Sequence, residues 1–207
     1  MYKVGILTII DIPEIVYHDT TTDNRQSLLT GVDITKSAKR VDFGKGFYTT
    51  QSEDSALELA IKRATAKNII AASRTYPVGI IYPVVFTYII NVDKMKTLKH
   101  RIFEEADDEW KDFVFDGRMA VPHLYDFTYG PVADAKIMNM VSDYENGKLD
   151  KEGFKNLLKS LKSDYYQLVV HTESAKECLN FEREVQVNGY KFVARNQNSS
   201  RIYGKRI

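Results

Sequence analysis

Apolar residues recur along the chain with helical spacing in some segments and in short continuous runs in others. The clearest helix is 54–72, where the helical spacing comes with abundant alanine. Ser52 stands where a helix cap is expected, and acidic residues follow it. The apolar positions of this amphipathic helix are Ala56, Leu59, Ala60 and Ala64.

Strands are predicted where β-branched and aromatic residues gather. The run 77–92 is almost wholly of this kind, with a break near Pro83, and 165–171 is a second clear strand. A short strand at 15–17 is expected to end at His18, where a polar turn follows. A strand or arm is expected at 1–12 and a further strand at 123–132, and Thr49-Thr50 is expected to be the end of a strand.

Helices are expected at 104–115, 134–144 and 150–162, with a helical turn at 25–29 and a helix or turn at 174–181. Strands and helices do not alternate regularly, which favours an α+β fold over a doubly wound sheet. The 207 residues suffice for one domain with its own core, spanning 1–207, with a helical insertion around 134–162.

Composition and charge limit the partners, the cysteine-based sites and the location that can be expected for the protein. The net charge of +1 gives no general attraction to nucleic acid or acidic membranes, although residues 185–207 are basic and contain no Asp or Glu. A single cysteine excludes an internal disulfide framework and a multi-cysteine zinc site. We found no signal peptide and no membrane-spanning run, so a cytoplasmic protein without a membrane partner is expected.

The most informative stretch is 42–50, DFGKGFYTT. Gly44 and Gly46 allow a backbone that approaches a ligand closely, and Phe47 and Tyr48 follow at once. The stretch is equally consistent with a site that holds a flat ring and with a tight turn whose aromatics fill the core.

Several familiar sites are excluded. No GK[ST] phosphate loop and no GxGxxG turn is present. The four histidines show no metal-binding spacing, so no metal site is predicted.

Three separated pieces resemble the His-Tyr-Glu branch of the ADP-ribosyltransferase superfamily, which includes diphtheria-type toxins and poly-ADP-ribose polymerases. In that branch a strand ends in His, a second carries GKGxY, and a third begins at a catalytic Glu. The matching segments here are YHDTT with His18, GKGFY with Tyr48, and YYQLVVHT with Gln167 at the Glu position. The chain also resembles a bacterial family of uncharacterised transferase-like proteins over most of 14–181. The segments shared with that family are DFGKGFYTT, DEWKDFVFDGR, YDFTYGPVADA and YYQLVVHTESA.

The resemblance implies a split β-sheet core with flanking helices and NAD as co-substrate in its cleft. It implies that His18 bonds a ribose hydroxyl of the adenosine half and that the backbone of Asp19 bonds the nicotinamide amide. Tyr48 would stack on the nicotinamide ring, and Gln167 would bond the 2′-hydroxyl of the nicotinamide ribose. Other implied cofactor-binding residues are Thr20, Gly46, Phe47 and Leu59, the last where a second stacking aromatic would stand.

Gln167 is the main departure from that branch, because an amide can orient a hydroxyl but brings no negative charge to the developing oxocarbenium ion. In one reading the substrate or a nearby acid, Asp19, Asp126 or Glu173, supplies the charge. In another the chain is a catalytically silent module that binds NAD or ADP-ribose and acts through protein partners. Gln167 as an ordinary strand residue also stays open.

The expected function is mono-ADP-ribosylation of a macromolecular acceptor, protein or nucleic acid, because polymer synthesis in the polymerases depends on the glutamate. The general character of the family points to a bacterial toxin or phage-defence effector, with an antitoxin protein as a partner. NAD hydrolysis without an acceptor is a third reading.

Overall fold

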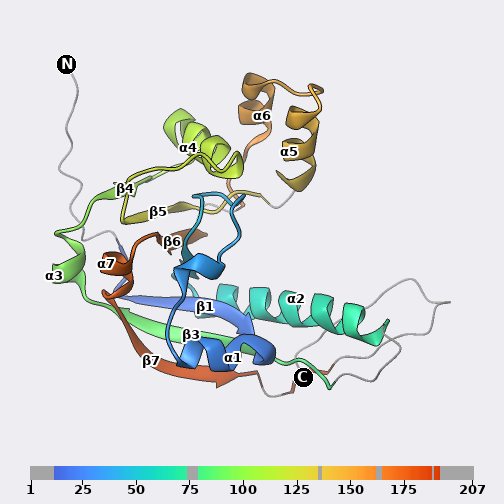
Figure 1. The fold of residues 1–207 in the computed structure, drawn as a ribbon, viewed down its shortest axis with the longest axis vertical. Coiled ribbons are helices and arrows are strands. Elements are labelled where there is room, and N and C mark those ends of the chain that lie inside the picture. The colour runs from blue at the N-terminus through green and yellow to red at the C-terminus, as the bar shows by residue number, and fades with distance from the viewer. Residues whose placement is uncertain (1–11, 74–78, 135–136, 162–164, 188, 192–207) are drawn as a thin grey trace.

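A computed structural model describes residues 12–73, 79–134, 137–161, 165–187 and 189–191. In this part of the chain seven α-helices surround one mixed, open sheet of seven strands (Figure 1), so the predicted α+β class is confirmed. The sheet order is β4-β5-β6-β2-β1-β3-β7, with β4 and β5 parallel and the other neighbours antiparallel. The strands are β1 (Ile15–Thr21), β2 (Phe47–Thr50), β3 (Pro83–Ile90), β4 (His100–Ile102), β5 (Phe127–Pro131), β6 (Tyr166–Val170) and β7 (Leu179–Gln186).

The long helix α2 (Glu53–Ala72) forms where the sequence predicts it. Ser52 caps it, its hydroxyl oxygen accepting from the Ser55 amide at 3.2 Å. The small side chains of Ala56 and Ala60 are fully buried and pack against Val85 of β3, which lets the helix lie close to β1 and β3.

A second group of helices lies beside β4 and β5 in Figure 1. It comprises α4 (Asp108–Arg118), α5 (Ile137–Glu145) and α6 (Lys151–Leu157). The last two are the helices predicted between 134 and 162. The predicted helix at 104–115 begins four residues later, because Asp107 caps it by accepting from the Trp110 amide at 2.8 Å. The remaining helices are α1 (Thr22–Leu29), α3 (Val92–Met95) and α7 (Glu173–Lys176), with a 3-10 turn at Ile34–Lys36.

Three strands have ends that differ from the prediction. β1 continues past His18 to Thr21 because it pairs with β3 along its whole length, so His18 lies within the strand. β3 begins at Pro83, and residues 79–82 before it are not in a strand. β5 begins at Phe127, four residues later than predicted.

Two strands were not predicted. β4 has only three residues, too few for a pattern to be recognised. β7 is an edge strand with mostly exposed residues, so it lacks a buried apolar face, and its start falls in the segment predicted as a helix or turn. The strand expected at 1–12 and most of the basic tail lie outside the described residues.

The sheet is joined weakly at its centre. β1 shares seven register pairs with β3, and β2 shares four with β6, whereas β1 and β2 share the single pair Tyr17↔Thr50. Beyond that pair the two parts of the sheet separate. No helix in the described residues is long and apolar enough to cross a membrane.

Candidate functional site

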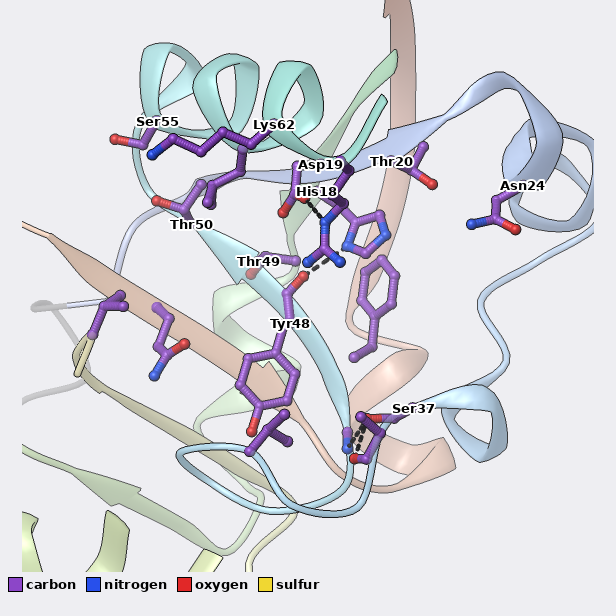
Figure 2. A pocket seen from close by; sticks show the side chains of 18 of the residues that line it. His18, Asp19, Thr20, Asn24, Ser37, Tyr48, Thr49, Thr50, Ser55 and Lys62 are labelled. Carbon is purple, nitrogen blue, oxygen red and sulfur yellow. Dashed lines mark hydrogen bonds and ion pairs between the residues drawn. The ribbon is translucent and has the colours of Figure 1, made fainter. Parts of the chain in front are cut away.

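A pocket of about 820 Å³ opens where β1 and β2 separate. Its walls come from β1, β2, β6, α1, α2 and the connection 33–41. Figure 2 shows His18 and Asp19 of β1 near Tyr48 of β2, while the side chain of Lys62 on α2 extends toward Ser55. Pockets of this volume hold cofactor-sized ligands. All eight residues predicted for the site line this one pocket: His18, Asp19, Thr20, Gly46, Phe47, Tyr48, Leu59 and Gln167.

The two glycines of DFGKGFYTT are required for different reasons, Gly44 by its backbone conformation and Gly46 by close contacts. Gly44 has a φ of +75°, which disfavours other residues. A Cβ on Gly46 would lie 2.6 Å from Val169 Cγ1 and 2.7 Å from the Val170 carbonyl oxygen. The Gly46 amide donates to the Ser37 hydroxyl at 3.1 Å, which ties the loop to the opposite wall. The backbone therefore lies directly against β6 at the base of the pocket.

The hydroxyl and the ring of Tyr48 have different roles. The hydroxyl accepts from the Phe43 amide at 3.0 Å and donates to the Gly44 carbonyl at 2.7 Å. Burial, followed by the nearby charge of Asp42, raises the pKa of the phenol. The hydroxyl thus holds its own loop, and what Tyr48 offers a ligand is the ring that lines the pocket.

His18 is held as a neutral hydrogen-bonding group. Its Nδ1 lies 2.7 Å from the Tyr48 carbonyl oxygen, and its ring stacks on Phe47 with centroids 4.3 Å apart. Because a carbonyl only accepts, Nδ1 carries the proton and Nε2 is left as an acceptor. Burial lowers the pKa of the imidazole, which favours this neutral form. An acceptor of this kind suits a ligand hydroxyl.

The backbone at Asp19 faces the pocket side of β1. The amides of Thr22 and Ile90 bond across to the carbonyls of Tyr82 and Glu14, which shows that even-numbered residues of β1 bond to β3. In an antiparallel pair the alternate residues point the other way, so the peptide groups of Asp19 point toward β2. Asp19 lies beyond the last register pair with that strand.

Gln167 is hydrogen-bonded to the ion pair of Asp42 and Arg118, which the sequence analysis missed. Its Nε2 donates to Asp42 Oδ2 at 3.3 Å, and Asp42 Oδ1 accepts from Arg118 Nε at 2.9 Å. Gln167 is 7% exposed and Asp42 6%. Asp42 and Arg118 stand inside two segments quoted above for the family resemblance, but nothing in the sequence shows that the two meet.

Four basic residues of the pocket wall were also missed. Arg63 forms an ion pair with Asp19, and Lys67 bonds Asp23 at 2.8 Å. Lys62 has no hydrogen bond or ion pair within the described chain. All three stand on α2, where the sequence analysis considered only the apolar positions of the helix. The basic residues of the wall are Lys36, Lys62, Arg63 and Lys67.

Of the three acids considered as a source of negative charge, only Asp19 lines the pocket. Asp126 instead accepts from the Lys99 amide at 2.9 Å and from the Thr172 hydroxyl at 2.7 Å, so its carboxylate fastens two connections together. Glu173 forms an ion pair with Lys176 inside α7. Among the described residues no group of three or more His, Cys, Asp or Glu side chains is arranged to hold a metal ion.

Comparison with known proteins places the chain in a family without an assigned activity. The family model described as "Protein of unknown function (DUF3990)" matches residues 15–181, which include every residue of the pocket wall. No curated protein and no solved structure matches the chain.

Proposed function

Since the chain belongs to the DUF3990 family, whose function is unknown, we propose from its own pocket that it is an NAD-dependent mono-ADP-ribosyltransferase. The ADP-ribosyltransferase character is our proposal and rests on the site, because the family description names no activity. The acceptor in this proposal is a macromolecule, either protein or nucleic acid.

One observation carries the proposal: His18, Tyr48 and Gln167, which are far apart in sequence, line the same pocket. The weak β1–β2 junction agrees with the split sheet that the resemblance implies. Two of these side chains have a group that suits the ligand: the acceptor Nε2 of His18 for a ribose hydroxyl and the ring of Tyr48 for nicotinamide. In the proposed complex the peptide groups of Asp19, which point toward β2, pair with the nicotinamide amide.

The proposed reaction breaks the bond between the nicotinamide nitrogen and C1′ of the ribose. The bonding electrons leave with nicotinamide, C1′ becomes an oxocarbenium-like centre, and an acceptor nucleophile bonds to C1′ and loses its proton to solvent. Such a transition state resembles that of glycoside cleavage. The Gln167 amide orients the 2′-hydroxyl, and Asp19 of the pocket wall supplies negative charge once the ligand has drawn Arg63, its ion-pair partner, away. Without a glutamate, transfer is expected to be slower by roughly a hundred-fold, the usual effect of losing one electrostatic stabiliser.

The wall also carries basic side chains suited to the pyrophosphate of NAD. Lys62 is the best placed, since no acid within the described residues neutralises it, whereas Arg63 and Lys67 already have carboxylate partners. A charged hydrogen bond to phosphate is stronger than one between neutral groups. The proposed setting, a bacterial toxin or phage-defence effector held by an antitoxin protein, comes from the family resemblance and not from the pocket.

The test is incubation of the protein with NAD labelled on the adenosine half and with bacterial lysate. Label on a macromolecule, lost in both Tyr48→Ala and Gln167→Ala, supports the enzyme. Lys94→Ala is the control, because Lys94 pairs with Glu177 at the protein surface and does not line the pocket. Nuclease and protease treatment then identify the acceptor.

Two other outcomes would refute transfer. NAD binding without label under any condition would indicate a silent NAD or ADP-ribose module, a possibility kept open by the missing negative charge of Gln167. Release of nicotinamide at the same rate with and without lysate, with no labelled acceptor, would indicate NAD hydrolysis.

A further inference from the structure

We propose that Asp42, held by Arg118, is a positioning residue that turns the oxygen of the Gln167 amide toward the ligand, and that this acid is the reason position 167 holds glutamine. The inference rests on the proposed function for its catalytic meaning. The structural claim, that Asp42 orients the Gln167 amide, depends only on the hydrogen bonds around Asp42.

The Asp42 carboxylate is surrounded by donors from distant segments. Oδ1 accepts from the Arg118 guanidinium at the end of α4, with Nε at 2.9 Å. Oδ2 accepts from the Ala133 amide at 3.2 Å and from Gln167 Nε2 at 3.3 Å. Asp42 is buried and the Arg118 side chain is 11% exposed, so solvent competes little for these bonds. The carboxylate is therefore fixed in place.

A fixed carboxylate dictates the orientation of the amide beside it. A carboxylate only accepts, so Gln167 must turn its NH₂ group toward Asp42. The opposite orientation would bring two oxygens together without a proton between them. Oε1 is consequently turned away from Asp42, and Gln167 belongs to the pocket wall while Asp42 does not. The exposed end of the amide is then an acceptor, which suits the ribose 2′-hydroxyl.

The same geometry explains the departure from glutamate. A carboxylate at 167 would face Asp42 Oδ2 at hydrogen-bond distance, while the Arg118 guanidinium bonds the other oxygen, Oδ1. Two like charges at this separation cannot both stay ionised without a large cost, so one would take up a proton. Glutamine avoids that conflict. An exchange of the two chemical groups, with Asn at 42 and Glu at 167, would restore one amide, one carboxylate and the hydrogen bond between them.

The experiment compares Asp42→Asn, Gln167→Glu and the double variant with the unaltered chain. NAD turnover gives kcat and KM, and urea unfolding gives the midpoint for each protein. Each single variant is expected to lower kcat by about ten- to a hundred-fold with a smaller change in KM, as misorientation of a reacting group does. The double variant is expected to have a clearly higher kcat and a clearly higher urea midpoint than the sum of the two single effects predicts. Asp112→Asn is the matched control, because Asp112 is likewise an acid paired with basic side chains, but it stands on α4 at the surface and does not line the pocket.

The two proposals fail in different ways. If no protein cleaves NAD yet the urea midpoints show coupling between positions 42 and 167, the transferase proposal falls and the positioning of Gln167 stands. If the urea midpoint and the kcat of the double variant equal the values expected from adding the effects of the two single variants, Asp42 does not orient Gln167 and the inference is overturned. Asp42→Asn with unchanged kcat would overturn it as well.

Discussion

His171 provides a test of how the glycine loop is held. Its Nδ1 lies 2.8 Å from the Lys45 carbonyl oxygen, and its Nε2 lies 2.9 Å from the Thr128 hydroxyl. Burial, with a smaller contribution from His123, lowers the pKa of His171 from 6.5 to about 4. The folded protein therefore needs the imidazole neutral, in the form that joins the loop to β5.

The direction of the pH effect follows from the difference between the pKa of His171 in the folded protein and in the unfolded chain. Between pH 6.5 and about 4 the unfolded chain binds a proton that folded His171 excludes. The stabilisation is complete above pH 6.5 and is lost progressively as the pH falls through this range. The difference in pKa corresponds to about 3 kcal/mol of unfolding free energy.

The assay is urea unfolding of the unaltered chain and of His171→Gln, each at several pH values between 7.5 and 4. Other groups titrate in both proteins, including His18, whose lowered pKa acts in the same direction. The informative quantity is therefore the difference in unfolding free energy between the two proteins at each pH. That difference should shrink by about 3 kcal/mol on acidification. A difference that stays constant across the range would refute the burial argument.

Three further substitutions test the pocket itself. Lys62→Ala should weaken NAD binding by about tenfold in calorimetry, as the loss of a charged hydrogen bond does, and the deficit should diminish at high salt. Gly46→Ala should lower the unfolding free energy by about 1–3 kcal/mol in a urea titration, because the new Cβ would overlap Val169 and the adjacent backbone. Tyr48→Phe should cost about 1–3 kcal/mol by leaving a main-chain N–H unpaired, while NAD binding persists because the ring is kept. An equal loss of binding in Tyr48→Phe and Tyr48→Ala would contradict this division of roles.

Local signals in the sequence were sufficient for the elements that carry their own pattern. α2 has helical spacing, a serine cap and buried alanines, and it forms as predicted. β6 has a continuous apolar run and agrees with the predicted strand to within a residue at each end. β7 could not be predicted in this way, because an exposed edge strand has no apolar face and depends on pairing with β3.

The candidate site shows the same limit. His18, Tyr48 and Gln167 were found through motifs, and the register of β1, β2 and β6 brings them to one pocket. Asp42 and Arg118 could not be recognised as partners, since an ion pair across 76 positions leaves no local trace. The structure shows that the Tyr48 hydroxyl anchors the loop and that its ring lines the pocket, while stacking of that ring on a ligand stays a prediction.

The contacts around Asp42 explain why the helices outside the sheet matter for the site. A Cβ on Gly117 would lie 2.4 Å from the Asp42 carbonyl oxygen, so only a glycine lets α4 come this near, and the next residue, Arg118, then reaches the carboxylate. Ala133 and Gln167 contribute the remaining donors. Of the four segments that the sequence analysis singled out, DFGKGFYTT supplies the carboxylate, and DEWKDFVFDGR, YDFTYGPVADA and YYQLVVHTESA supply one donor each to it. The separated sheet creates the pocket, but it is α4 and the connection after β5 that determine how the amide at its base is turned.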